Sequence, residues 1–67
     1  MIELAINGET RTFPAPLSLA QLIVLLDLTG KRIAIEKNGE IVPRSLHAST
    51  PLVSGDRLEI VVAVGGG

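Results

Sequence analysis

The sequence contains no cysteine, tryptophan or tyrosine, one phenylalanine (Phe13) and one histidine (His47). Without cysteine the chain forms no disulfide, binds no metal through thiolates and has no catalytic thiol. Nucleic-acid-binding proteins stack bases on aromatic side chains or carry a strongly basic surface. This chain has neither feature, because it has a single aromatic residue and its formal net charge is −1 at pH 7. We therefore expect no nucleic-acid partner.

Long apolar runs are also missing. The longest, residues 22–26 and 60–64, have five residues each, whereas a membrane-spanning helix needs about 20. The first four residues lack the basic segment and apolar core of a signal peptide. We therefore expect a cytoplasmic protein that does not associate with membranes. Its 67 residues, 46% of them hydrophobic, fit one domain near the lower size limit for folding on a single core.

The most strand-prone segment lies at the end of the sequence. Apolar residues alternate between two faces over residues 58–64, which is the period-2 pattern of a β-strand. The outward positions after Glu59 are apolar too, so we expect a central strand that is covered on most sides. Three glycines, Gly65, Gly66 and Gly67, follow without a polar spacer. We interpret residues 1–64 as one domain and residues 65–67 as a flexible functional tail.

Two Asn-Gly pairs predict two β-hairpins. Such pairs favour the type I′ turn, which needs positive φ at both central residues. Asn7-Gly8 lies between predicted strands at residues 2–6 and 9–13, and Asn38-Gly39 lies between strands at residues 32–37 and 40–42. Residues 44–51 have no periodicity, and we expect a loop with one helical turn there.

One helix is predicted between the hairpins. Ser18 and Gln21 have the spacing of a capping box, and an apolar stripe with helical spacing follows them. We expect the helix to end at Gly30, with Lys31 and Arg32 beyond it favoured by the helix dipole. Val24 and Leu25 widen the apolar stripe, and we expect them to pack under a loop; contact with a partner is the alternative.

The predicted element order is therefore β-β-α-β-β-β. Short connections and the right-handed crossover rule place the last strand parallel to the first. The expected fold is of the α+β class: a β-grasp, or ubiquitin-like, domain in which one helix packs across a mixed sheet of about five strands. The expected core consists of Ile2, Leu4, Ile6, Leu22, Ile23, Leu26, Ile33, Ile35, Leu58, Ile60 and Val62.

The side chains offer no catalytic or metal-binding constellation. A metal site needs several ligands, so we expect the lone His47 to be a surface or loop residue. Asp56 is expected to cap the turn at residues 54–56. We therefore expect no enzyme and no resident cofactor or metal. The remaining reactive group is the carboxylate of Gly67. The glycine tail that carries it has no side chains, so the tail could thread a partner's narrow tunnel. The carboxylate could then attack a nucleotide phosphate there.

The whole chain resembles the ubiquitin-like sulfur carriers, and in particular their thiamine-biosynthesis (ThiS) branch. The resemblance depends on the Gly66-Gly67 ending and on the run from Ile33 to Ser45, which contains Asn-Gly-Glu-Ile-Val-Pro-Arg. The turn Ser54-Gly55-Asp56-Arg57 is shared more widely and is weaker support. Two features depart from the family pattern: Lys37 stands where an apolar residue is common, and Gly65 precedes the usual pair.

The resemblance implies a cycle carried out by partner enzymes. An E1-like adenylyltransferase of the ThiF type would adenylate Gly67 with its own ATP and magnesium. Sulfur from a donor such as a cysteine desulfurase would then give a Gly67 thiocarboxylate, and a thiazole synthase of the ThiG type would take up that sulfur. We expect Gly65 and Gly66 to thread the partner sites. Apolar residues expected near the tail suggest a docking surface of Ala5, Val61 and Ala63.

Three alternatives remain at this point. The chain could supply sulfur for molybdopterin or another pathway, although its short length and the Ile41–Arg44 run argue against this. It could be a ubiquitin-like modifier that is conjugated to lysines. It could also be an interaction module in which the terminal glycines have no function.

Overall fold

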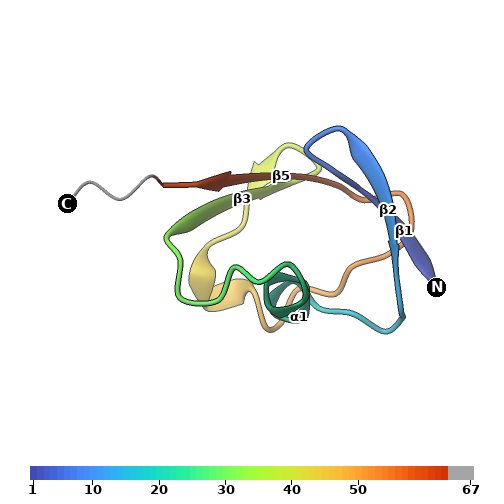
Figure 1. The fold of residues 1–67 in the computed structure, drawn as a ribbon, viewed down its shortest axis with the longest axis horizontal. Coiled ribbons are helices and arrows are strands. Elements are labelled where there is room, and N and C mark those ends of the chain that lie inside the picture. Colours follow the sequence, from blue (N-terminus) through green and yellow to red (C-terminus); the bar gives the residue numbers. More distant parts are fainter. Residues whose placement is uncertain (64–67) are drawn as a thin grey trace.

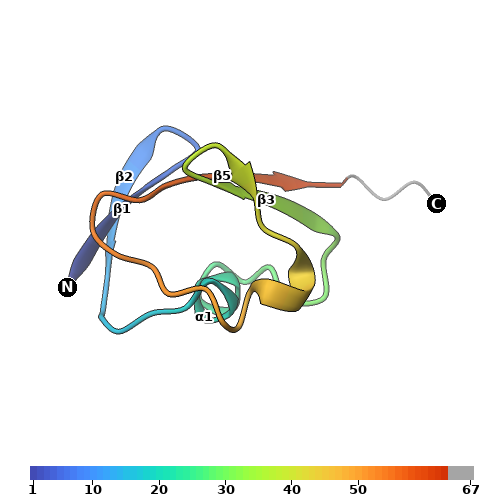
Figure 2. The ribbon, with the colours of Figure 1, turned by 180° about the vertical axis from the view of Figure 1, so that it is seen from behind.

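A computed structural model describes residues 1–63 of the chain. Five strands form one sheet in the order β2-β1-β5-β3-β4, and helix α1 lies across one face of it (Figure 1). The same two layers are visible from behind in Figure 2. The elements are β1 (Ile2–Ile6), β2 (Glu9–Phe13), α1 (Leu19–Leu25), β3 (Ile33–Lys37), β4 (Glu40–Ile41), the 3-10 helix η1 (Arg44–Leu46) and β5 (Arg57–Val62).

This arrangement confirms the predicted β-grasp fold. Strand β5 is central, as expected, and runs parallel to β1 and antiparallel to β3. The two neighbouring strands, β1 and β3, pair with β5 over different lengths. Strand β3 pairs with β5 over five residues, from Lys37–Leu58 to Ile33–Val62, whereas β1 pairs only at Ala5–Arg57 and Ile6–Leu58. The second half of β5 therefore extends beyond β1.

Both predicted hairpins are present with their expected turns. Asn7 and Gly8 have φ of 50° and 84°, and Asn38 and Gly39 have φ of 52° and 88°. Positive φ at both central residues is the requirement of a type I′ turn, which explains the choice of Asn and Gly. The return strand β4 is one residue shorter than predicted and ends before Val42.

Helix α1 begins as predicted and ends earlier than predicted. The Ser18 side chain accepts from the Gln21 N–H, and the Gln21 side chain accepts from the Ser18 N–H, which completes the capping box. The helix ends at Leu25, so the predicted end at Gly30 is wrong and no basic residue lies in the last turn. Asp27 takes the left-handed conformation at φ 58° instead of a glycine. The N–H groups of Asp27 and Leu28 donate to the carbonyls of Val24 and Ile23, closing a Schellman motif.

The core lies between α1 and the sheet and includes most of the predicted residues. Six of the eleven are buried and four more are partly buried against them. Val62 is the error, because its side chain is 40% exposed at the end of β5. The predicted core omitted four buried apolar residues. Leu17 and Leu52 lie in connecting segments, where periodicity carries no information, and Phe13 and Leu19 are terminal residues of β2 and α1.

Two apolar surfaces that were expected to be covered are open. Val61, on the face of β5 away from α1, is 64% exposed, so β5 is central but not covered on that face. On α1, Val24 and Leu25 are 64% and 54% exposed, and the prediction that a loop covers them is wrong. Within residues 1–63, no helix is long and apolar enough to cross a membrane.

Candidate functional site

The first half of β5 is held by the two Asn-Gly turns. The Asn7 side chain donates to the Ile60 carbonyl (Nδ2–O 3.1 Å) and accepts from the Ile60 N–H (2.7 Å). Its amide thus occupies the place of a strand peptide beyond the end of β1. On the other side of β5, the Asn38 side chain accepts from the Arg57 N–H at 2.9 Å and donates to Asp56 at 3.0 Å.

Asp56 is buried and caps the turn before β5, as predicted. One carboxylate oxygen accepts from the Val53 N–H at 3.0 Å, and the other accepts from the Asn38 side chain. The burial of this charge is therefore compensated by hydrogen bonds to both oxygens. The start of β5 is thereby fixed to the loop before it and to the β3–β4 turn.

The second half of β5 leads to the glycine tail. Beyond Ile6–Leu58 no β1 residue pairs with it, and β3 follows it to Ile33–Val62. The Ala63 N–H then donates to the Arg32 carbonyl at 2.8 Å. This end of β5 points away from the N-terminus and from the β1–β2 hairpin (Figure 1). Gly65, Gly66 and Gly67, the predicted modified tail, lie outside the described residues.

The structure does not bring the three proposed docking residues together. Val61 and Ala63 are exposed near the end of the described chain, and Ala34 lies beside Val61 in the strand register. Ala5 lies on the same face, but it pairs with Arg57 at the other end of β5. Four residues of strand, about 13 Å, separate Arg57 from Val61. Ala5 therefore does not belong to the surface at the tail end.

A groove with an apolar floor and two arginines lies at this end of β5. It has a volume of about 440 Å³ and is lined by residues of β3, the end of β5 and two flanking segments. The basic groups are Arg32, immediately before β3, and Arg44, the first residue of η1. No carboxylate lines it. We call it the arginine groove: Arg32, Ile33, Ala34, Arg44, Val61 and Ala63.

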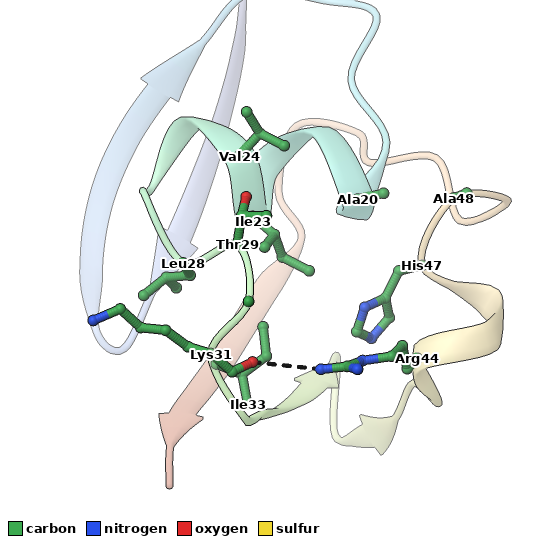
Figure 3. A pocket seen from close by; sticks show the side chains of 11 residues that line it. Ala20, Ile23, Val24, Leu28, Thr29, Lys31, Ile33, Arg44, His47 and Ala48 are labelled. Atoms are coloured by element: carbon green, nitrogen blue, oxygen red, sulfur yellow. Dashed lines mark hydrogen bonds between the residues drawn. The ribbon is translucent and has the colours of Figure 1, made fainter. Parts of the chain in front are cut away.

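Arg44 also borders a second pocket, of about 330 Å³, between α1 and η1. The Arg44 guanidinium donates to the Lys31 carbonyl at 3.4 Å (Figure 3). His47 lines the same pocket and is 6% exposed, so its prediction as a surface residue is wrong, although it lies in the expected loop. Its Nε2 lies 3.0 Å from the Val42 carbonyl, and this hydrogen bond offsets the cost of burying the imidazole.

The described residues contain no set of side chains arranged for metal binding. Among residues 1–63, no three histidine, aspartate or glutamate side chains are grouped closely enough to hold an ion. His47 is committed to Val42, and Asp56 is committed to Val53 and Asn38. Within residues 1–63, the feature of this region that is open to a partner is the arginine groove.

Comparison with known proteins agrees with this geometry. The ThiS family model matches residues 4–67, which include the three glycines. The chain belongs to the ThiS family. Its fold is similar to the crystal structure of the thiamine biosynthesis protein ThiS from Geobacter metallireducens, with a TM-score of 0.82 and 28% identity. The match covers 98% of this chain and 100% of that one.

Two curated relatives are similar to nearly the whole of this chain. The chain is 42% identical over 66 residues to a thiazole synthase of Paramagnetospirillum magneticum, covering 98% of this chain but only 20% of the relative. It therefore spans about a fifth of that protein's length. It is also 44% identical to the uncharacterized protein ycf40 of Porphyra purpurea, covering 98% of this chain and 93% of that protein.

Sequence reasoning assigned the two arginines to other roles. Arg32 was expected to follow the end of a helix, and Arg44 was noted only within a run typical of ThiS proteins. The register of the β3–β5 strand pair is the signal that could have located one of them, Arg32. Because β3 pairs antiparallel with β5, the residue before Ile33 must lie beside the residue after Val62. The position of Arg44 depends on how η1 folds back toward β3, and no local pattern predicts it.

Proposed function

We propose that this chain carries sulfur for the synthesis of the thiazole of thiamine, with the Gly67 carboxylate as its reactive group. The observation that carries the proposal is the ThiS family match over residues 4–67, because it extends through the glycine tail. The 42% identity to part of a thiazole synthase supports that enzyme as the sulfur acceptor. The exposed end of β5 supports a tail that reaches into a partner.

In the proposed cycle, a carboxylate oxygen of Gly67 attacks the α-phosphorus of ATP on an E1-like adenylyltransferase, and pyrophosphate leaves. The terminal persulfide sulfur of a donor such as a cysteine desulfurase then attacks the acyl carbon and displaces AMP, and a thiol reduces the resulting acyl disulfide to the thiocarboxylate while a disulfide forms. Thiazole synthase transfers this sulfur to its substrate, and an oxygen atom from the substrate or from water replaces it at the acyl carbon, which restores the carboxylate. ATP and magnesium belong to the activating enzyme, so the carrier acts as a protein co-substrate and not as a catalyst.

The proposed roles of the carrier and its partner enzymes agree with the physical chemistry of the chain. The carboxylate is ionised at neutral pH and is a poor electrophile until it is activated. Glycines without Cβ atoms let the backbone pass through a narrow channel. The fold supplies a central strand whose start is fixed by Asn7 and Asn38 and whose end is exposed. Such a strand can present a tail to several enzymes in turn.

The test is the mass of the intact protein before and after incubation with the activating enzyme, ATP and a sulfur source. The starting mass shows whether the chain carries a free carboxylate on Gly67, which the proposal requires. Replacement of oxygen by sulfur adds about 16 Da, nominally the same as oxidation of Met1. The added mass must therefore be located in the C-terminal peptide and be trapped by a thiol-reactive alkylating agent.

A mass increase on Gly67 that needs ATP is the expected result. A matched protein lacking Gly67 should stay unmodified under the same conditions. An unmodified full-length chain, in a reaction where the enzyme activates another carrier, would contradict the proposed function. An isopeptide ladder that needs Gly67 would instead identify a protein modifier.

A further inference from the structure

The basic side chains are unevenly distributed over the fold. The sequence has six lysines and arginines and seven acidic residues. Three of the six, Lys31, Arg32 and Arg44, line the arginine groove or the pocket beside it, and no acidic residue lines either. The lining of the groove where β5 ends is therefore basic, and the outward carboxylates of Glu36 and Glu59 face each other two residues further back along β3 and β5.

We propose that the arginine groove is a docking site for an acidic segment of the activating enzyme, whose carboxylates pair with Arg32 and Arg44. This inference rests on the proposed function, because the activating enzyme is the partner that it invokes. It adds the chemistry by which that partner recognises this carrier.

The groove has the composition of a protein-binding site. Val61 supplies an exposed apolar contact, and Ala34 and Ala63 are small enough to let a partner backbone approach. The two cations are both arginines, whose planar guanidinium groups are weakly hydrated and bind carboxylates through two parallel hydrogen bonds. An apolar centre with an arginine rim matches the usual anatomy of a protein interface.

The position of Ala63 favours a protein carboxylate over a nucleotide phosphate as the occupant. The Ala63 N–H bonded to the Arg32 carbonyl fixes Ala63 beside the groove. Four residues separate Ala63 from the end of the sequence, and an extended chain of that length spans about 13 Å. A tail threaded through a channel would thus place Arg32 and Arg44 at the channel mouth and Gly67 at the ATP.

Charge reversal tests the proposal directly. The variants are Arg32→Glu, Arg44→Glu and the double variant, and the matched control is Arg57→Glu. Arg57 lies on the same strand and the same outer face as Val61, but at the other end of β5. We expect the Kd for the activating enzyme, measured without ATP, to rise about tenfold or more in the double variant and less than about threefold in the control. The wild-type affinity should fall with salt, and the double variant should lose most of that dependence.

Folding must be separated from docking in these variants. Arg44 donates to the Lys31 carbonyl, so Arg44→Glu can disturb that loop. Within residues 1–63, Arg32 forms a hydrogen bond through its backbone carbonyl and none through its side chain, and Arg32→Glu retains that carbonyl. Thermal unfolding of each variant identifies any loss of fold, and Arg32→Glu alone then decides the result.

A cross-link identifies the chemistry of the occupant. Arg32→Lys and Arg44→Lys keep the positive charge and add an amine, which a zero-length carbodiimide couples to a carboxylate in direct contact. We expect peptides in which residue 32 or 44 is joined to an aspartate or glutamate of the activating enzyme, and no such product from Arg57→Lys. The absence of these peptides, or equal Kd values for Arg32→Glu and Arg57→Glu, would overturn the docking proposal.

The same samples keep the two proposals distinguishable. If Gly67 gains sulfur normally in the charge-reversed variants while their affinity is unchanged, the carrier function stands and the docking site is wrong. If the variants raise the KM for ATP but not the Kd for the enzyme, the arginines face the nucleotide and the acidic-segment assignment is wrong. If wild-type protein is never modified, the proposed function fails, and the assignment of the activating enzyme fails with it.

Discussion

The two halves of β5 have the same strand geometry and opposite surroundings. Over Arg57–Ile60, inward side chains are buried and the backbone is bonded on both sides, by β3 and by the Asn7 and Asn38 turns. At Val61 and Val62, and at Ala63 just after the strand, side chains are exposed, β1 does not pair, and only β3 and the Arg32 carbonyl accompany the chain. One half anchors β5 in the domain, and the other is the half that we propose presents the tail.

This difference shows how a small domain can be both stable and open to partners. A 67-residue chain cannot spare much of its core, since stability is a small difference between large terms. Placing the anchor and the open surface on one strand lets the core fix the position of the exposed end of β5. Within β5, the exposed apolar side chains are those of Val61 and Val62, at the end where a partner is proposed to bind.

The largest expected contrast comes from truncating one side chain in each half. Leu58→Ala should lower the free energy of unfolding by about 2–5 kcal/mol, because Leu58 is 1% exposed and a cavity would remain. Val61→Ala should change it by less than about 0.5 kcal/mol. Urea unfolding followed by circular dichroism measures both. Similar losses for the two variants would show that the halves do not differ in stability.

The Asn7 side chain is the next test of the anchored half. Asn7→Ala should cost about 2 kcal/mol, because it leaves the N–H and carbonyl of Ile60 without their partner and places alanine at φ 50°. Thr10→Ala, on the neighbouring edge strand, is the control and should cost less than about 0.5 kcal/mol, since Thr10 is exposed. A negligible effect of Asn7→Ala would mean that water replaces these bonds without loss.

In the open half, the expected effect is on binding. Val61→Asp should leave the unfolding free energy nearly unchanged and weaken binding to the activating enzyme about tenfold, or about 1.4 kcal/mol. A charge would replace an exposed apolar contact at the arginine groove. The control is Thr10→Asp, which introduces the same negative charge on the same face of the sheet. Thr10 lies beside Ala5, at the far end of the sheet. Equal Kd values for the two variants would remove Val61 from the docking surface.

Local signals in the sequence predicted most of the fold. The Asn-Gly turns, the capping box at Ser18 and the alternation along β5 each involve residues close in sequence, so their physics is visible without a structure. The helix end was missed because Asp27 adopts a conformation that glycine adopts more easily, and Gly30 gave the stronger signal.

Long-range features could not be predicted in the same way. The burial of His47 depends on the Val42 carbonyl and on how η1 folds back. The arginine groove combines residues from η1, β3 and β5, and only the β3–β5 register could have related Arg32 to Ala63 in advance. For Gly67, the family resemblance supplied a chemistry that no residue pattern alone could establish.

Val62 marks the boundary between the two halves and provides the smallest expected effect. Alternation correctly predicts that its side chain points inward, but a pattern of period 2 says nothing about how far the core extends along a strand. Because Val62 is 40% exposed, Val62→Ala should cost less than about 1 kcal/mol, while Ile60→Ala, two residues earlier at 8% exposure, should cost about 2–4 kcal/mol. Urea unfolding of the two variants measures this difference in unfolding free energy. A loss for Val62→Ala as large as that for Ile60→Ala would place the end of the core beyond β5, and the open half would then begin within the tail itself.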